Sequence, residues 1–300
     1  WDSLRKIDGT LPGLLESERR LLEANVLMAQ GRYADAAAVL RTAPSDDWGA
    51  YARFNLGVAL VRSADAVEGQ RWLEAVGTMP AVSDEQLSLR DRANLALGFA
   101  RLQQSEAEPA VAALTRVRLD GPFTNRALLG LGWAESDAKR PDRALVPWLE
   151  LRERRLLDSA VQESYLAVPY AYAQLASNGQ AAEQYRYAIE AYGKEASRID
   201  QSVGAIRRGG FLESMLDAAP AGDSVGWLWQ LQTLPDASQT RYLYHLLASH
   251  EFQEGLKNYR DLRIMQRNLE GWRESLAAFD EMVAAREQAA SLIEPRRRDM

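Results

Sequence analysis

The chain has 300 residues, a formal net charge of −6 and no cysteine, with 47% hydrophobic and 26% charged residues. A disordered chain would hold much less apolar material, and a surface built for nucleic-acid phosphates would be basic. Without cysteine there are no disulfides, thiolate zinc sites or cysteine nucleophiles. No apolar run approaches the roughly 18 residues that span a bilayer. The composition favours a folded protein with no nucleic-acid partner.

Two stretches, 97–122 and 131–151, repeat one another at a fixed interval of 34 residues. Small and large apolar residues recur in step along them, and a period of this size indicates a helical repeat array. The pairs that keep the interval are Gly98 and Gly132, Ala110 and Ala144, and Leu114 and Trp148.

In chain order, residues 1–16 contain Gly9, Pro12 and Gly13 and are predicted to be an irregular lead-in. Residues 17–192 follow a helical period and are predicted to form a solenoid of about five helix–turn–helix hairpins. Residues 193–262, where the period fades, are expected to be degenerate helical repeats, including a sixth hairpin near 252–262. A long C-terminal helix, expected to be truncated, occupies 263–300.

Three local signals refine this plan. Ser83 and Gln86 have the spacing of a capping box at the start of a helix. Gly57, Gly98 and Gly132 are expected to let the two helices of a hairpin approach closely. Pro147 falls inside a predicted helix, where proline costs about 3 kcal/mol, so we expect a kink that redirects Trp148.

The last helix carries large apolar residues at alternating intervals of three and four, which is an a/d heptad seam. The positions beside the seam are poorly charged for a dimeric coiled coil. We therefore favour a helix that packs back on the solenoid, with homo-oligomerisation as the alternative. The seam residues are Leu262, Met265, Leu269, Trp272, Leu276, Phe279 and Val283.

These residues resemble the tetratricopeptide repeat (TPR) family. Its pattern of Leu-Gly, Ala, a large residue and a closing Pro is matched by Leu97-Gly98, Ala110, Leu114 and Pro122. The resemblance covers roughly 17–190 well and 236–262 weakly. It implies an all-α fold, a right-handed superhelical array whose first helices line a concave surface. Pentatricopeptide RNA binders share the hairpin but are typically basic, and the negative charge argues against them.

The resemblance implies that a protein or peptide partner binds this concave surface. The family's carboxylate-gripping Lys and Asn are absent except for Asn25, so no carboxylate clamp is expected. An apolar and aromatic lining suits an amphipathic helix or an extended apolar peptide. We expect Phe99 and Trp133 to be at least half buried. The candidate partner-binding residues are Tyr51, Phe54, Val58, Arg92, Phe99, Arg126, Trp133 and Tyr170.

Catalysis finds little support in the residues. The only histidines, His245 and His250, would point apart if they shared one helix, and no phosphate loop or nucleophile elbow occurs. We expect no catalytic residue, no metal and no cofactor. An enzyme site between the solenoid and residues 195–260 is the minor alternative.

The sequence thus predicts a non-enzymatic interaction scaffold, with a structural protein that assembles through its C-terminal helix as the alternative. Because the chain begins at Trp1 and is rich in Ala, Leu and Arg, we expect a bacterial protein of the periplasm or cell envelope. A removed N-terminal segment could have anchored it to a membrane. A cytoplasmic location is the alternative.

Overall fold

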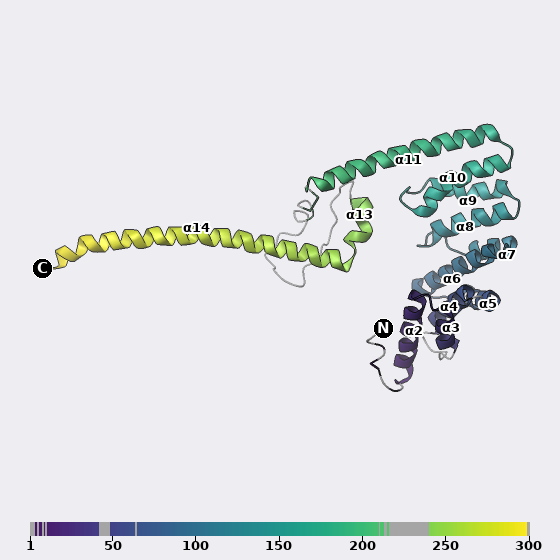
Figure 1. The fold of residues 1–300 in the computed structure, drawn as a ribbon, viewed down its shortest axis with the longest axis horizontal. Helices are drawn as coiled ribbons and strands as arrows, with labels where there is room; N and C mark the ends of the chain where they lie inside the picture. The colour runs from purple at the N-terminus through teal and green to yellow at the C-terminus, as the bar shows by residue number, and fades with distance from the viewer. Residues whose placement is uncertain are drawn as a thin grey trace. The chain divides into compact units, whose positions relative to one another are not determined.

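The structure is a computed structural model that describes residues 11–41, 49–63, 65–209 and 240–298, together with residues 4, 6, 7, 9, 211, 212 and 215. Within these residues every extended element is a helix and none is a strand, so the all-α prediction is confirmed (Figure 1). The longer helices are α2 (Gly13–Ala29), α3 (Tyr33–Arg41), α4 (Gly49–Arg62), α5 (Ala66–Gly77), α6 (Asp84–Gln103), α7 (Ala107–Leu114), α8 (Thr124–Asp137), α9 (Pro141–Arg152), α10 (Ser159–Gln174), α11 (Asn178–Arg207), α13 (Thr240–Leu247) and α14 (His250–Arg298).

The chain divides into two compact units, Trp1–Tyr192 and Gly193–Met300. In the first unit each helix from α2 to α10 packs on the next, which gives a stack of helical hairpins. The first helices of successive hairpins, namely α2, α4, α6, α8 and α10, also contact one another. The second helices make no comparable contacts among the described residues. Because the first helices lie closer together, the stack curves towards them.

Glycines sit where the two helices of a hairpin meet. A Cβ on Gly57 would lie 2.8 Å from Cγ of Leu73, and one on Gly98 would overlap the side chain of Leu114. A Cβ on Gly132 would overlap the indole of Trp148. The predicted close approach of the paired helices is confirmed at all three positions.

The turn inside the hairpins has a repeated conformation. Gly31, Ser105, Lys139 and Ala176 occupy equivalent positions and have positive φ angles of 76°, 61°, 63° and 55°. In each turn the next residue donates its N–H to the carbonyl five residues earlier, for example from Arg140 to Glu135 at 3.0 Å. This is the hydrogen bond of a helix C-terminus that ends in a left-handed residue. Only the first of these turns uses glycine.

Two local predictions have different outcomes. The Ser83 hydroxyl accepts the N–H of Gln86 at 3.2 Å, and the Gln86 amide accepts the N–H of Val82 at 2.9 Å, which confirms the cap. The redirection of Trp148 is wrong, because α9 continues through Pro147 and the indole is fully buried. Helix α9 tolerates the missing N–H of Pro147. Trp148 therefore keeps the position that Leu114 has in the preceding hairpin.

Several predicted boundaries are corrected. Helix α2 already begins at Gly13, inside the expected lead-in. Helix α11 does not end at the predicted solenoid boundary, residue 192, but runs through Gly193, where a Cβ would meet nothing within 4 Å. It ends before Gly209, which has a φ of +83°. The expected sixth hairpin at 252–262 is the start of α14, which Gly255 and Gly271 do not interrupt. The sequence also predicts a helix at 227–231, a segment that lies outside the described residues.

The second unit has a small apolar core. Phe211, Met215, Leu247 and Leu256 are buried together, and the Tyr242 hydroxyl donates to Glu195 at 2.8 Å. Beyond Ile264 the side chains of α14 are exposed through residue 290. None of the described helices is both long and apolar enough to cross a bilayer.

Candidate functional site

The site that the sequence predicts lies on the face shared by α2, α4, α6, α8 and α10, here called the first-helix face. Two rows of equivalent residues run across it, one residue from each helix. The first row is Asn25, Val58, Phe99, Trp133 and Tyr170, and the second row, two turns earlier, is Glu18, Tyr51, Arg92, Arg126 and Glu163. The first row becomes aromatic from α6 onwards, and the second row carries two arginines in its middle.

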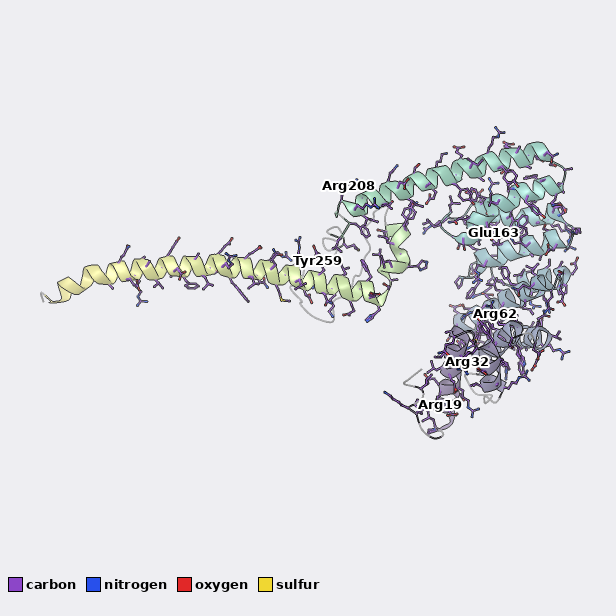
Figure 2. The ribbon with its side chains drawn as sticks, viewed as in Figure 1. Arg19, Arg32, Arg62, Glu163, Arg208 and Tyr259 are labelled. Atoms are coloured by element: carbon purple, nitrogen blue, oxygen red, sulfur yellow. The ribbon has the colours of Figure 1, made fainter. Side chains whose placement is uncertain are left out.

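Trp133 is the centre of the aromatic part. Its ring packs edge-on against Trp148 with centroids 4.9 Å apart, and it lies 5.9 Å from the ring of Tyr170. Its Nε1 donates to the Glu163 carboxylate at 2.7 Å, which links α8 to α10; Figure 2 labels Glu163. The indole is only partly exposed, whereas Tyr170 and Glu163 are exposed. A ligand would therefore meet Tyr170 and one edge of Trp133.

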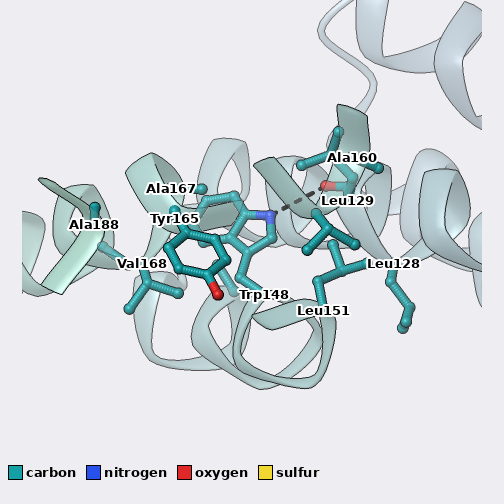
Figure 3. Packing of buried hydrophobic residues seen from close by; sticks show 12 residues of the cluster. Leu128, Leu129, Trp148, Leu151, Ala160, Tyr165, Ala167, Val168 and Ala188 are labelled. Carbon is teal, nitrogen blue, oxygen red and sulfur yellow. Dashed lines mark hydrogen bonds between the residues drawn. The ribbon is translucent and has the colours of Figure 1, made fainter. Parts of the chain in front are cut away.

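Trp133 packs against a large cluster of buried residues, which Figure 3 shows around Trp148. Trp148 has no exposed surface, and its Nε1 donates to the Leu129 carbonyl at 3.2 Å. Leu151, Val161 and Val168 fill the space around it without exposure. This packing fixes the ring of Trp133 from below, so the aromatic row rests on a rigid base.

The basic part of the face lies on α6 and α8. Arg92 is exposed, and its guanidinium carbon lies 4.9 Å from the centroid of the Phe54 ring on the neighbouring helix. Arg126 is exposed as well. An arginine stacked on an aromatic ring keeps its hydrogen-bond donors available. The two arginines can pair with carboxylates of a partner.

Other predicted residues are less accessible. Phe54 is buried at 5% exposure and belongs to the core. Val58 and Phe99 are partly buried, and a Cβ on Gly130 would lie 3.1 Å from the Phe99 ring, so α6 and α8 meet there. Tyr51 is partly buried and donates its hydroxyl to Glu85, a bond that raises the pKa of the tyrosine. Phe99 and Trp133 are at least half buried, as expected.

The eight predicted residues therefore differ in exposure, and most of them remain accessible on the first-helix face. Arg92, Arg126 and Tyr170 are exposed, Trp133, Phe99, Val58 and Tyr51 are partly exposed, and Phe54 is buried. Leu166 on α10 adds an apolar side chain exposed at 52%. The accessible surface consists of two arginines in the middle of the array and an apolar, aromatic end on α10.

A buried polar network joins the third hairpin to the helix before it and escaped the sequence analysis. Asp91 is 2% exposed and accepts Nε of Arg118 at 2.7 Å, and Asn94 donates to the Gly77 carbonyl at 2.9 Å. Arg116 donates to Asn94 at 2.8 Å. In the sequence, only the polar side chains of Asp91 and Asn94 among the apolar residues of α6 indicate such a network. The network joins α6 to α5 and to the segment that follows α7.

The described residues contain no group of three His, Asp or Glu side chains arranged to hold a metal ion. His245 and His250 do not share a helix as assumed, because α13 ends at Leu247 and α14 begins at His250. Both imidazoles are exposed.

The described part of the first unit folds as a TPR-like array of helical hairpins, with first helices inside the curve. No protein-family model matches the chain, and no curated protein matches it at the significance threshold.

Several solved structures are similar. MamA from MSR-1 is 19% identical with a TM-score of 0.46, over 60% of this chain and 99% of that one. A second MamA structure is 16% identical with a TM-score of 0.48, over 58% and 96%. A Podosopora anserina protein, named as a kinesin light chain with nearly identical TPR-like repeats, is 14% identical with a TM-score of 0.49, over 62% and 99%.

Proposed function

We propose that this protein is a non-enzymatic scaffold that binds a partner protein or peptide on the first-helix face. The observation that carries the proposal is the exposed set of Arg92, Arg126 and Tyr170 on successive first helices. Arg92 stacks on the buried Phe54, and Tyr170 lies beside Trp133, whose ring packs on the buried cluster. Helical-repeat proteins use the extended inner surface of the stack for binding. Exposed aromatic and arginine side chains on a fixed base are the residues that dominate protein interfaces.

The chemistry of the face suggests the kind of partner. Leu166 and Tyr170 offer apolar contact on α10, and Arg92 on α6 and Arg126 on α8 offer positive charge. An amphipathic helix or an extended apolar peptide that also carries acidic residues satisfies both parts. The Oδ1 of Asn25 accepts Nδ2 of Asn55 at 2.8 Å. Because the other Lys and Asn residues of a carboxylate clamp are absent from this face, we expect a partner held by its side chains rather than by its terminal carboxylate.

The test is a crosslinking pull-down with the full-length protein in the organism that encodes it, read by mass spectrometry. The double variant R92E/R126E reverses two charges on the first-helix face. The matched control R71E/R143E makes the same change at exposed positions on the second helices α5 and α9. We expect the control to recover the partners of the unmodified protein and R92E/R126E to lose them. Equal recovery by both variants would contradict the proposal.

The cell envelope as the setting of this scaffold stays a prediction from composition. Cell fractionation followed by detection of the untagged protein tests it directly. Recovery with the cytoplasmic fraction alone would contradict an envelope role and would leave the binding proposal standing.

A further inference from the structure

The last helix of the second unit, α14, is buried at Leu256 and Ile264, and among the described residues its side chains beyond Ile264 are uncovered. Side chains of α14 from Met265 to Ala290 are exposed among the residues described. The seven seam residues defined above are exposed by 50–64%. An isolated helix is marginal in water and normally owes its stability to packing of an apolar face. A helix of 49 residues with an uncovered seam therefore needs a partner along its length.

We infer that the partner is the α14 helix of a second copy of this chain, which pairs with the first in antiparallel orientation. This goes beyond the scaffold function, because it uses another helix and another surface. Three independent features of the seam support it, namely its area, the sizes of its side chains and the charges beside it.

The area suffices for a stable dimer. Aromatic side chains such as Trp272 and Phe279 bury roughly 150–250 Å² each. Together with the five aliphatic and Met residues of the seam, all exposed by 50–64%, they present apolar surface on the order of 800 Å². A standard stable interface buries about 800 Å² per partner. An uncovered apolar patch of this size on a soluble protein marks an interaction site.

The sizes of the side chains favour antiparallel pairing. The a positions carry only aliphatic residues, Leu262, Leu269, Leu276 and Val283, and the d positions carry the bulky Met265, Trp272 and Phe279. In a parallel pair identical residues meet, so Trp272 would face Trp272 between layers of paired leucines. In an antiparallel pair a faces d, so every layer combines one aliphatic and one bulky side chain. Evenly filled layers pack without voids or overlap.

The flanking charges agree. Arg273 and Asp280 lie on the same flank of the seam, the e positions. In an antiparallel pair equal flanks face each other, and helical side chains lean towards their own N-terminus, so Arg273 of one copy approaches Asp280 of the other. In a parallel pair Arg273 would face Asn268 and Asp280 would face Ser275, and neither of these partners carries a charge.

The first test is the mass of the 300-residue chain in solution by light scattering. We expect twice the 33.5 kDa of one chain. The variant L276E/F279E should be monomeric, whereas the control A277E/A284E adds the same charge outside the seam and should remain dimeric. A monomeric unmodified chain at high concentration, or a dimer that survives L276E/F279E, overturns the inference. These outcomes are independent of partner capture by the first-helix face.

The second test leaves the seam intact and measures orientation. The chain has no cysteine, so single cysteines at Glu274 and at Gln288 can each carry one spin label. An antiparallel pair of six apolar layers is centred near Glu274, so labels there should be separated only by the width of the helix pair, roughly 20 Å for two helices about 10–12 Å across. Labels at Gln288 should be about 42 Å apart, from a rise of 1.5 Å per residue. Equal short distances at both positions would indicate a parallel pair and overturn the antiparallel assignment.

Discussion

The α-carbon of Gly132 lies against the indole of Trp148, so closely that a single methyl group on the glycine would overlap Nε1 of the ring. The same relationship holds between Gly98 and Leu114 one hairpin earlier. A helical-repeat protein depends on such contacts, because each hairpin closes only if its two helices meet at short range. The indole of Trp148 then supports Trp133, which belongs to the proposed binding face.

The first prediction concerns this contact. Replacement of Gly132 by alanine should lower the free energy of unfolding by about 1–3 kcal/mol, the usual cost of an overfilled core. Urea unfolding followed by tryptophan fluorescence measures it. The matched control is Gly193→Ala, where the methyl group meets nothing within 4 Å inside α11. The control should be stabilising by about 0.5–1 kcal/mol, and equal effects of the two substitutions would contradict the packing argument.

The hairpins and their glycines were predictable because they depend on residues that recur along the sequence. Gly57, Gly98 and Gly132 mark the close contacts by their spacing alone. The turns are different, since Ser105 and Lys139 adopt a left-handed conformation that neither residue type signals. A repeated main-chain geometry imposes it there.

The second prediction concerns these strained turns. A residue with a Cβ in the left-handed conformation lowers the free energy of unfolding by roughly 1–2 kcal/mol relative to glycine. Glycine in turn lowers it by about 0.4–1 kcal/mol, because it increases the conformational entropy of the unfolded chain. Lys139→Gly should therefore be more stable than Lys139→Ala by several tenths to about 1 kcal/mol. Thermal and urea unfolding of the two variants make the comparison. A more stable alanine variant would show that the turn does not hold this φ angle in solution.

The candidate site was predictable only in outline. The helical period placed Phe54 and Arg126 on the same face, but the sequence could not distinguish the buried phenylalanine from the exposed arginine. That difference depends on how far a neighbouring hairpin covers each side chain. The network around Asp91 was missed for the same reason, because its partners come from separate helices and only the packed stack brings them together.

A third prediction addresses that network. Asp91 is almost fully buried and accepts both Nε and the main-chain N–H of Arg118, at 2.7 and 3.2 Å. Asp91→Asn should cost about 1.5–3 kcal/mol, the range for hydrogen bonds to charged groups. Asp35→Asn makes the same change in the exposed pair with Arg32 and should cost less than about 1 kcal/mol. Similar costs for both would mean that burial of Asp91 contributes nothing.

The fourth prediction tests whether Trp133 contacts Glu163 in solution. The hydrogen bond from Nε1 to the carboxylate is 2.7 Å long and lies at the surface. Glu163→Gln keeps an acceptor and should change stability by less than about 1 kcal/mol. Trp133→Phe removes the donor and much of the ring's contact with Tyr170 and should cost more. Urea unfolding of the two variants gives their free energies of unfolding. Equal values for both variants would contradict the contact.

The last prediction concerns acid. Hydrogen bonds from Arg19 and Arg20 lower the pKa of Glu16 from 4.5 to about 2. A carboxyl group with a depressed pKa in the folded state stabilises the fold above its unfolded value and loses that contribution as the pH falls. Glu16 should therefore stabilise α2 fully above pH 4.5 and progressively less towards pH 2.

Glu16→Gln measures this contribution directly. The variant should be less stable than the unmodified protein at pH 7, and the difference should shrink between pH 4.5 and 2, because the unmodified carboxyl becomes protonated there. Arg20→Gln removes one of the two cations and should move the loss of stability to higher pH. A stability difference that stays constant from pH 7 to 2 would show that the arginines do not hold the charge of Glu16 in the folded state.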